Sequence, residues 1–136
     1  MLPLVHFIKA SDPKMRSTIE ATRRELTSPQ GFVYRYKAYD DGLASDEGTF
    51  TICTLWLADN LILLGEVQEA RDLFEKLCAN TNDLGLLSEQ INTESGELLG
   101  NFPQAFSHLA VINTAYQLNK AMSRESASTP DHGIDG

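Results

Sequence analysis

The sequence predicts an all-α fold built from α/α hairpins, and two observations about its apolar residues carry this prediction. First, apolar residues recur at helical spacing in four segments, residues 13–26, 49–64, 66–79 and 105–122. Second, the segments 49–64 and 105–122 are apolar on nearly every side, whereas the other two are apolar on one face only. Helices that are apolar all round, alternating along the chain with helices that are apolar on one face, are expected where inner and outer helices form two layers.

Length and composition indicate a single domain. With 136 residues and 42% hydrophobic content, the chain can form one globular core, which we assign to residues 1–122. Residues 123–136 are polar and rich in Gly, Pro and Ser, so we predict a disordered tail there. The net charge of −8 repels phosphate backbones and anionic membrane surfaces. Nucleic acid and membranes are therefore not expected as partners.

Several features favour a soluble, cytoplasmic protein. The N-terminus lacks the basic region of a secretory signal. The longest apolar run, residues 50–64, is interrupted by Asp59 and Asn60 and is too short to cross a membrane. Cys53 and Cys78 lie in apolar helical patterns without CxxC or Cys/His spacing, which favours buried thiols over a disulfide or a zinc site.

The first predicted helix, residues 13–26, has recognisable signals at both ends. Asp12 is a suitable N-cap, and Pro13 occupies the first helical position, where its missing N–H costs no hydrogen bond. The turn sequence SPQG at residues 28–31 follows the helix. Residues 32–36, FVYRY, are aromatic and β-branched, so we predict a short extended segment after the turn.

An acidic loop at residues 39–48 leads into the second predicted helix. Its carboxylates lack the alternate-position pattern of an EF-hand calcium loop, so we expect neither a metal nor another cofactor. Gly65 separates the second helix, residues 49–64, from the third, residues 66–79. Acidic residues open the third helix and Lys76 lies near its end, an arrangement that matches the helix macrodipole.

The connection between the third and fourth predicted helices contains the strongest candidate for a functional residue. Glu89 is flanked by Leu86, Leu87 and Ile91, and such an apolar environment suits a general base near neutral pH. The other interpretation is a loop glutamate that caps a turn. A segment rich in Gly, Pro and aromatic residues then runs into the fourth helix, residues 105–122, and resembles the wall of a site.

Two further residues are candidates for ligand contact. Arg35 lies between Tyr34 and Tyr36, where it could clamp a hydroxyl-rich ligand or stack on aromatic rings at the surface. His108, one turn into an apolar helix, is by itself more typical of a core histidine than of a catalyst. Ser107 precedes it, but sequence neighbours on a helix do not face each other, so the pattern does not indicate a catalytic Ser-His pair.

Three segments carry a resemblance to a known family. They are GFVYRY at residues 31–36, DDGLASDEGTFTICTLWLADNLILLGEVQEARDLFEKL at 40–77 and NDLGLLSEQINTESGELLGNFPQAFSHLAVINTA at 82–115. Over residues 2–119 the sequence resembles the C-terminal part of the bacterial glucoamylase and trehalase-like enzymes of glycoside hydrolase family 15. The resemblance implies part of an (α/α)6 barrel, and an enzyme that hydrolyses terminal α-linked glucosides with inversion, using one glutamic acid as general acid and another as general base.

The resemblance also implies roles for individual residues. Glu89, in the segment LLSEQ, matches the catalytic base, which would activate a water on the face of the sugar ring opposite the leaving group. Arg35, in VYRY, resembles a substrate-binding arginine near the scissile bond. Phe106 stands where some members have Trp, so an aromatic side chain is kept there. The residues expected to bind the α-linked glucose di- or oligosaccharide are Arg35, Tyr36, Glu47, Phe106 and His108.

The chain departs from this family in its extent. The family's general acid lies upstream of the matching region, and no segment here resembles it. A barrel of twelve helices needs about 350 residues or more, so we expect a fragment, either a truncated reading frame or one piece of a split enzyme. The apolar residues 1–10 are then the remains of an earlier barrel element. We expect no activity from the chain alone, and exposed apolar surface that favours self-association or a complementary N-terminal chain.

A non-catalytic helical module for protein interaction or sugar binding is the alternative function. The sequence LLGEVQEARDLFEKL, residues 63–77, resembles one helix pair of a tetratricopeptide-type repeat. No copy recurs at the spacing of about 34 residues that such arrays require. That alternative also leaves the GNFPQAFSH segment, residues 100–108, without a role.

Overall fold

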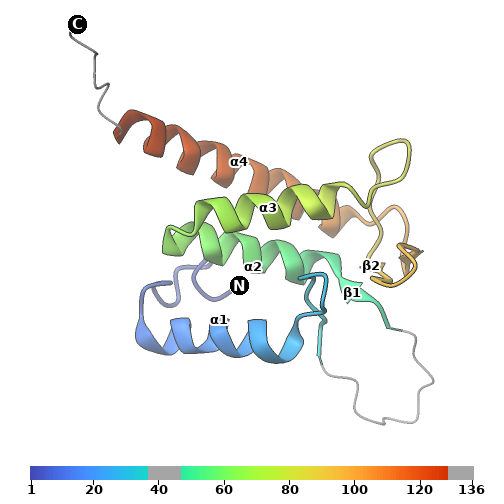
Figure 1. The fold of residues 1–136 in the computed structure, drawn as a ribbon, viewed down its shortest axis with the longest axis horizontal. Coiled ribbons are helices and arrows are strands. Elements are labelled where there is room, and N and C mark those ends of the chain that lie inside the picture. The colour runs from blue at the N-terminus through green and yellow to red at the C-terminus, as the bar shows by residue number, and fades with distance from the viewer. Residues whose placement is uncertain (37–46, 129–136) are drawn as a thin grey trace, which may run out of the picture.

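A computed structural model describes residues 1–36 and 47–128 of the chain (Figure 1). The predicted helical fold is confirmed, and a small antiparallel sheet accompanies the helices. In chain order the elements are α1 (Pro13–Leu26), β1 (Thr49–Phe50), α2 (Thr51–Leu64), α3 (Val67–Cys78), β2 (Gln90–Ile91), β3 (Leu98–Leu99) and α4 (Ala105–Ser128).

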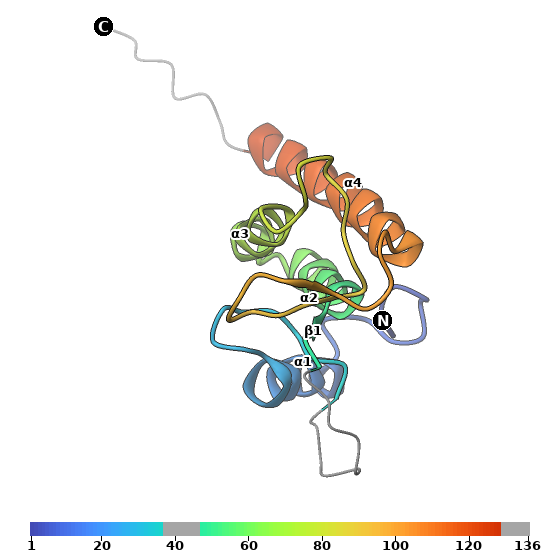
Figure 2. The ribbon, with the colours of Figure 1, turned by 90° about the vertical axis from the view of Figure 1, so that its right-hand side faces the viewer.

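Helix α2 is the centre of the fold. Figures 1 and 2 show α1 on one side of α2, with α3 and α4 on the other. The apolar residues of α2 leave no solvated stripe, so the helix can bury side chains toward both layers. The main core cluster joins all four helices and a loop residue: Met15, Ile19, Val33, Leu57, Ala58, Leu61, Val67, Ala70 and Leu118.

Helix α1 has the residue range that its end signals predict. The Oδ1 atom of Asp12 accepts a hydrogen bond from the backbone N–H of Lys14 at 2.9 Å, and Pro13 occupies the first turn. Helix α2 ends where expected, at Gly65, which adopts a left-handed conformation with φ of 85°. The N–H of Gly65 donates to the carbonyl of Ile62, which satisfies one of the last carbonyl groups of the helix.

The sheet was not predicted from the sequence. Its order is β1-β2-β3, with antiparallel pairing of Thr49 to Ile91 and of Gln90 to Leu99. Because residues 49 and 50 belong to β1, helix α2 begins two residues later than the predicted position 49. The predicted extended segment 32–36 contributes only an isolated bridge between Thr27 and Val33. The sheet fastens the loop after α3 to the start of α2.

The fourth helix is longer than predicted. It continues to Ser128, whereas we expected it to end at residue 122 and to be followed by a disordered tail. The sequence contains no helix breaker between 122 and Pro130, and Ser123 and Ser126 donate their hydroxyls to carbonyls one turn earlier. The rest of the predicted tail, residues 129–136, lies outside the described residues, as does most of the acidic loop at 39–48.

Helix α4 carries an apolar stripe that the described part of the chain leaves open. Phe106, Leu109, Ile112 and Tyr116 lie on one face and are 62–66% exposed. This helix was expected to be enclosed, but nothing in residues 1–36 and 47–128 covers that face. The exposed stripe confirms the expectation of exposed apolar surface. Soluble monomers rarely leave such faces open, so a stripe of this kind favours association. Despite this apolar content, none of the described helices is long and apolar enough to cross a membrane.

Candidate active site

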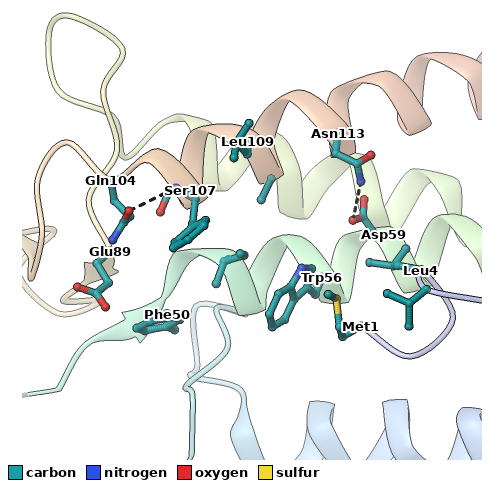
Figure 3. A pocket seen from close by; sticks show the side chains of 14 residues that line it. Met1, Leu4, Phe50, Trp56, Asp59, Glu89, Gln104, Ser107, Leu109 and Asn113 are labelled. Carbon is teal, nitrogen blue, oxygen red and sulfur yellow. Dashed lines mark hydrogen bonds between the residues drawn. The ribbon is translucent and has the colours of Figure 1, made fainter. Parts of the chain in front are cut away.

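A pocket of about 690 Å³ lies between α2, the start of α4 and the N-terminal segment (Figure 3). Its walls are mainly apolar, and polar side chains lie at its two ends. Figure 3 shows Glu89 and Gln104 at one end, with Asp59 and Asn113 at the other. A concave, mostly apolar pocket with a few convergent polar groups is typical of a small-molecule site. The lining residues also include Phe50, Ile52, Trp56, Phe106, Leu109 and Ala110.

The backbone of Glu89 is held from two directions. Its N–H donates to the carbonyl of Asn101 at 2.9 Å, and its carbonyl accepts from the N–H of Thr51 at 3.0 Å. Thr51 is the first residue of α2, so the second bond ties Glu89 to the most enclosed helix of the fold. Glu89 directly precedes β2, whose pairing with β1 and β3 fixes the direction in which the chain continues.

The two carboxylate oxygens of Glu89 have different surroundings. Oε2 accepts hydrogen bonds from the backbone N–H of Asn101 at 3.2 Å and from its side-chain amide at 2.9 Å. Among the described residues, no hydrogen bond reaches Oε1. One oxygen is therefore anchored and the other is available to a water or a ligand. The capping interpretation is correct in part, because Glu89 does accept a backbone N–H, but it does so across twelve residues rather than within a local turn.

Gly100 makes this position of Glu89 possible. Its φ is +73°, a conformation that side-chain-bearing residues rarely adopt. A Cβ atom on Gly100 would lie 2.9 Å from Oε2 and 3.1 Å from Cβ of Glu89. The glycine therefore provides both the turn and the space that the carboxylate occupies.

Arg35, Tyr36 and Glu47 form a second cluster beside the pocket. The guanidinium of Arg35 contacts the carboxylate of Glu47 at 2.5 Å and the hydroxyl of Tyr36 at 3.3 Å. It also lies 4.8 Å from the ring centre of Tyr36 and 5.3 Å from that of Phe50, a pocket residue. Arg35 is thus stacked on aromatic rings, one of which, Phe50, lines the pocket. The structure brings three predicted residues together here and places them next to the wall rather than in the cavity.

Similarity to known proteins decides the family. The sequence model of the family described as "Glycosyl hydrolases family 15" matches residues 1–116. The chain belongs to glycosyl hydrolases family 15. It is 44% identical over 127 residues to a trehalase of Mycolicibacterium smegmatis and 43% identical over 130 residues to a trehalase of Mycobacterium tuberculosis. A trehalase of Thermoplasma volcanium is 40% identical over 126 residues. No solved structure gives a significant match.

This family 15 chain spans about a fifth of the length of the relatives it matches. The alignments cover 92%, 94% and 93% of the chain but 19%, 19% and 20% of the three trehalases. The prediction that the chain corresponds to only part of a family 15 catalytic domain is therefore confirmed.

Phe106 and His108 of this glycosyl hydrolase chain have different positions. Phe106 lines the pocket and is 66% exposed, so its ring is free to contact a ligand. His108 is not among the lining residues. Its Nδ1 lies 2.7 Å from the carbonyl of Gln104, and its Nε2 accepts from the N–H of Leu87 at 3.3 Å. Both ring nitrogens of His108 are therefore engaged by backbone groups.

Asp59 is a site residue that the sequence analysis did not select. Its side chain is almost fully buried, and its Oδ2 accepts from the amide of Asn113 at 3.2 Å. Its Oδ1 is buried and has no hydrogen-bond partner of good geometry in the described part of the chain. Burial raises the pKa of the Asp59 carboxyl, although its contacts with Thr114 and Asn113 oppose the rise. The interruption of the apolar run at residue 59 was the signal that could have identified it.

Neither cysteine contributes to a metal site in the structure as described. Cys53 and Cys78 are free and half-buried, and burial raises the pKa of both thiols. Within residues 1–36 and 47–128, no group of three His, Cys, Asp or Glu side chains is arranged to hold a metal ion.

Proposed function

We propose that this chain supplies the general base of an inverting α-glucoside hydrolase and that the base is Glu89. The observation that supports this most strongly is the arrangement of its carboxylate, with Oε2 anchored by Asn101 and Oε1 without a partner among the described residues. A general base must be fixed in direction and must keep one atom free to receive a proton. Membership of glycosyl hydrolases family 15 supplies the reaction class.

In the proposed reaction Oε1 of Glu89 removes a proton from a water molecule. The water oxygen attacks the anomeric carbon, the glycosidic bond breaks, and a general acid protonates the leaving oxygen. Inversion requires the two carboxyl groups to lie about 6.5–9.5 Å apart, with the water between Glu89 and the sugar. Asp59, the other carboxyl residue of the pocket, is 2% exposed and lies at the opposite end in Figure 3, so it is not placed for this role.

The resemblance to family 15 enzymes implies that the general acid comes from a segment upstream of the matching region, outside residues 1–36 and 47–128. We propose that a complementary N-terminal chain, or the upstream part of the same domain, covers the apolar stripe of α4 and brings the acid to the pocket. The 62–66% exposure of this stripe supports the proposal, and without a covering segment the same face favours self-association. The chain alone is then inactive. A cytoplasmic location stays a prediction.

We propose an α-linked glucose disaccharide as substrate, with trehalose first, because the relatives are named trehalases. Phe106 offers an exposed ring against which a sugar face can pack. Arg35, with Tyr36 and Glu47, would contact the sugar if its side chain changed rotamer and moved off the ring of Phe50. That longer α-linked oligosaccharides bind here stays a prediction. That His108 contacts the sugar also stays a prediction.

A non-catalytic helical interaction module is the second candidate function, and the open stripe of α4 favours it. The two functions differ in sugar binding. A family 15 half-site binds trehalose or maltose weakly, and the affinity falls in Phe106→Ala and Arg35→Ala. A module that binds only protein has no measurable affinity for these sugars.

The test is to incubate the purified chain with trehalose, maltose and a longer α-glucan and to follow the anomeric protons by NMR. We expect weak binding without hydrolysis, because protonation of the leaving oxygen is missing. Absence of sugar binding by folded protein would favour the interaction module. Hydrolysis by the chain alone that is lost in Glu89→Gln would support the base but contradict the need for an outside acid.

A further inference from the structure

Gln104 and the first turn of α4 hold the two residues that precede Glu89. The carbonyl of Leu87 accepts from the N–H of Gln104 at 2.9 Å, and the carbonyl of Ser88 accepts from the hydroxyl of Ser107 at 2.8 Å. The N–H of Leu87 donates to Nε2 of His108 at 3.3 Å. Three backbone groups next to the proposed base are therefore bound by one short segment, and two of the three bonds come from side chains.

The contacts of His108 require one tautomer. A carbonyl oxygen can only accept, so the nitrogen 2.7 Å from the carbonyl of Gln104, Nδ1, must carry the hydrogen. Nε2 is then the unprotonated nitrogen and can accept the N–H of Leu87. The first bond lies within the helix turn, and it orients the ring so that the second bond can reach the loop.

These contacts are made by buried residues, one of which, Ser107, also borders the pocket. Leu87, Ser88 and Ser107 are each no more than 2% exposed. A buried backbone group that loses its partner cannot find water as a replacement, so each bond restricts the loop more than a surface contact would. Glu89, the next residue, is half-buried and points its carboxylate at Asn101 and the pocket.

We propose that Ser107 and His108 are positioning residues, which fix Glu89 by holding residues 87 and 88 against α4. The catalytic meaning of this assignment rests on the proposed role of Glu89 as base. The physical part, a loop held by an Nδ1–H tautomer of His108, does not depend on that role.

The experiment is amide hydrogen exchange and ¹⁵N NMR on the full chain without sugar. In His108→Gln the side-chain carbonyl oxygen is long enough to accept the N–H of Leu87, as Nε2 does. In His108→Asn the shorter side-chain amide can still donate to the carbonyl of Gln104, as Nδ1 does, but cannot reach Leu87. We expect exchange at Leu87 and Glu89 to quicken about fivefold in His108→Asn and to stay near wild type in His108→Gln. Ser107→Ala is expected to act like His108→Asn. The amide of Leu61 in α2 serves as a control for global unfolding.

Three results would overturn the proposal. They are a ring signal typical of hydrogen on Nε2, equal exchange in the Gln and Asn variants, or quickening that also affects Leu61. Since no substrate is present, these outcomes are independent of whether Glu89 is a base. Loss of the proposed function would appear separately, as hydrolysis that survives Glu89→Gln in a completed enzyme.

Discussion

At the scale of single residues, Glu89 depends on partners that lie far from it in the sequence. Its apolar neighbours and its resemblance to family 15 enzymes were enough to select it. The anchors were not predictable, because Asn101 and Ser107 reach residues 88 and 89 only through the path of the loop. His108 was selected as a sugar contact, which stays a prediction, and its bonds to Leu87 and Gln104 could not be predicted from the sequence.

Gly100→Ala is expected to displace Glu89, whereas Gly96→Ala is not. Both glycines have similar positive φ, +73° and +76°, so each substitution costs about 1–2 kcal/mol of stability from backbone strain. Only at position 100 does the new Cβ meet Glu89, since nothing lies within 4 Å of one at Gly96. Chemical denaturation of both variants, with NMR shifts of Glu89 and Asn101, measures the difference. Equal effects at the two positions would show that Gly100 serves only the turn.

Asp59 is expected to make stability depend on pH. Burial raises its pKa above the ordinary value of 3.8, so the folded chain binds this proton more tightly than the unfolded chain. The carboxylate therefore costs stability increasingly as pH rises from 3.8 through the raised pKa, and the full cost is reached above that pKa. Denaturation of wild type and Asp59→Asn across this range is the measurement. We expect the wild type to lose stability relative to the variant as pH rises, and a constant difference would contradict this.

At the scale of elements, the helices were predictable and the strands were not. Long segments with apolar residues at helical spacing gave all four helices, and the cap at Asp12 gave the start of α1. Each strand has two residues, too few to carry an alternating pattern, so β1, β2 and β3 have no sequence signal of their own. Their pairing is set by the connection that returns the loop to α2.

The apolar stripe of α4 is expected to drive association. Leu109→Gln with Ile112→Gln removes its two central aliphatic side chains, which are 62% and 66% exposed. Folding stability should change by no more than about 0.5 kcal/mol, because these side chains bury little in the chain itself. Sedimentation velocity and dye binding should show the wild type associated and the double variant less so, with Lys120→Gln as a control on the same helix. A monodisperse wild-type monomer without dye binding would contradict this expectation.

At the scale of the whole molecule, the sequence indicated both the family and the limited extent of the match. Family membership rests on the match over residues 1–116, and the chain spans about a fifth of its trehalase relatives. The apolar pattern of residues 105–122 predicted an enclosed helix, whereas the described residues leave one face of α4 open. The pocket beside Glu89 is bordered by the same helix, which contributes the exposed ring of Phe106.

The most direct measurement replaces the matching segment of the Mycolicibacterium smegmatis trehalase with the aligned part of this chain, and compares trehalose hydrolysis by this hybrid with that of its Glu89→Gln form. The substituted side chain keeps the size of Glu89 but cannot accept a proton from water. We expect the hybrid to release one β- and one α-glucose per trehalose, and Glu89→Gln to lower kcat about 10²–10⁴-fold. Hydrolysis that is equally fast in both forms would contradict the assignment of Glu89 as the general base.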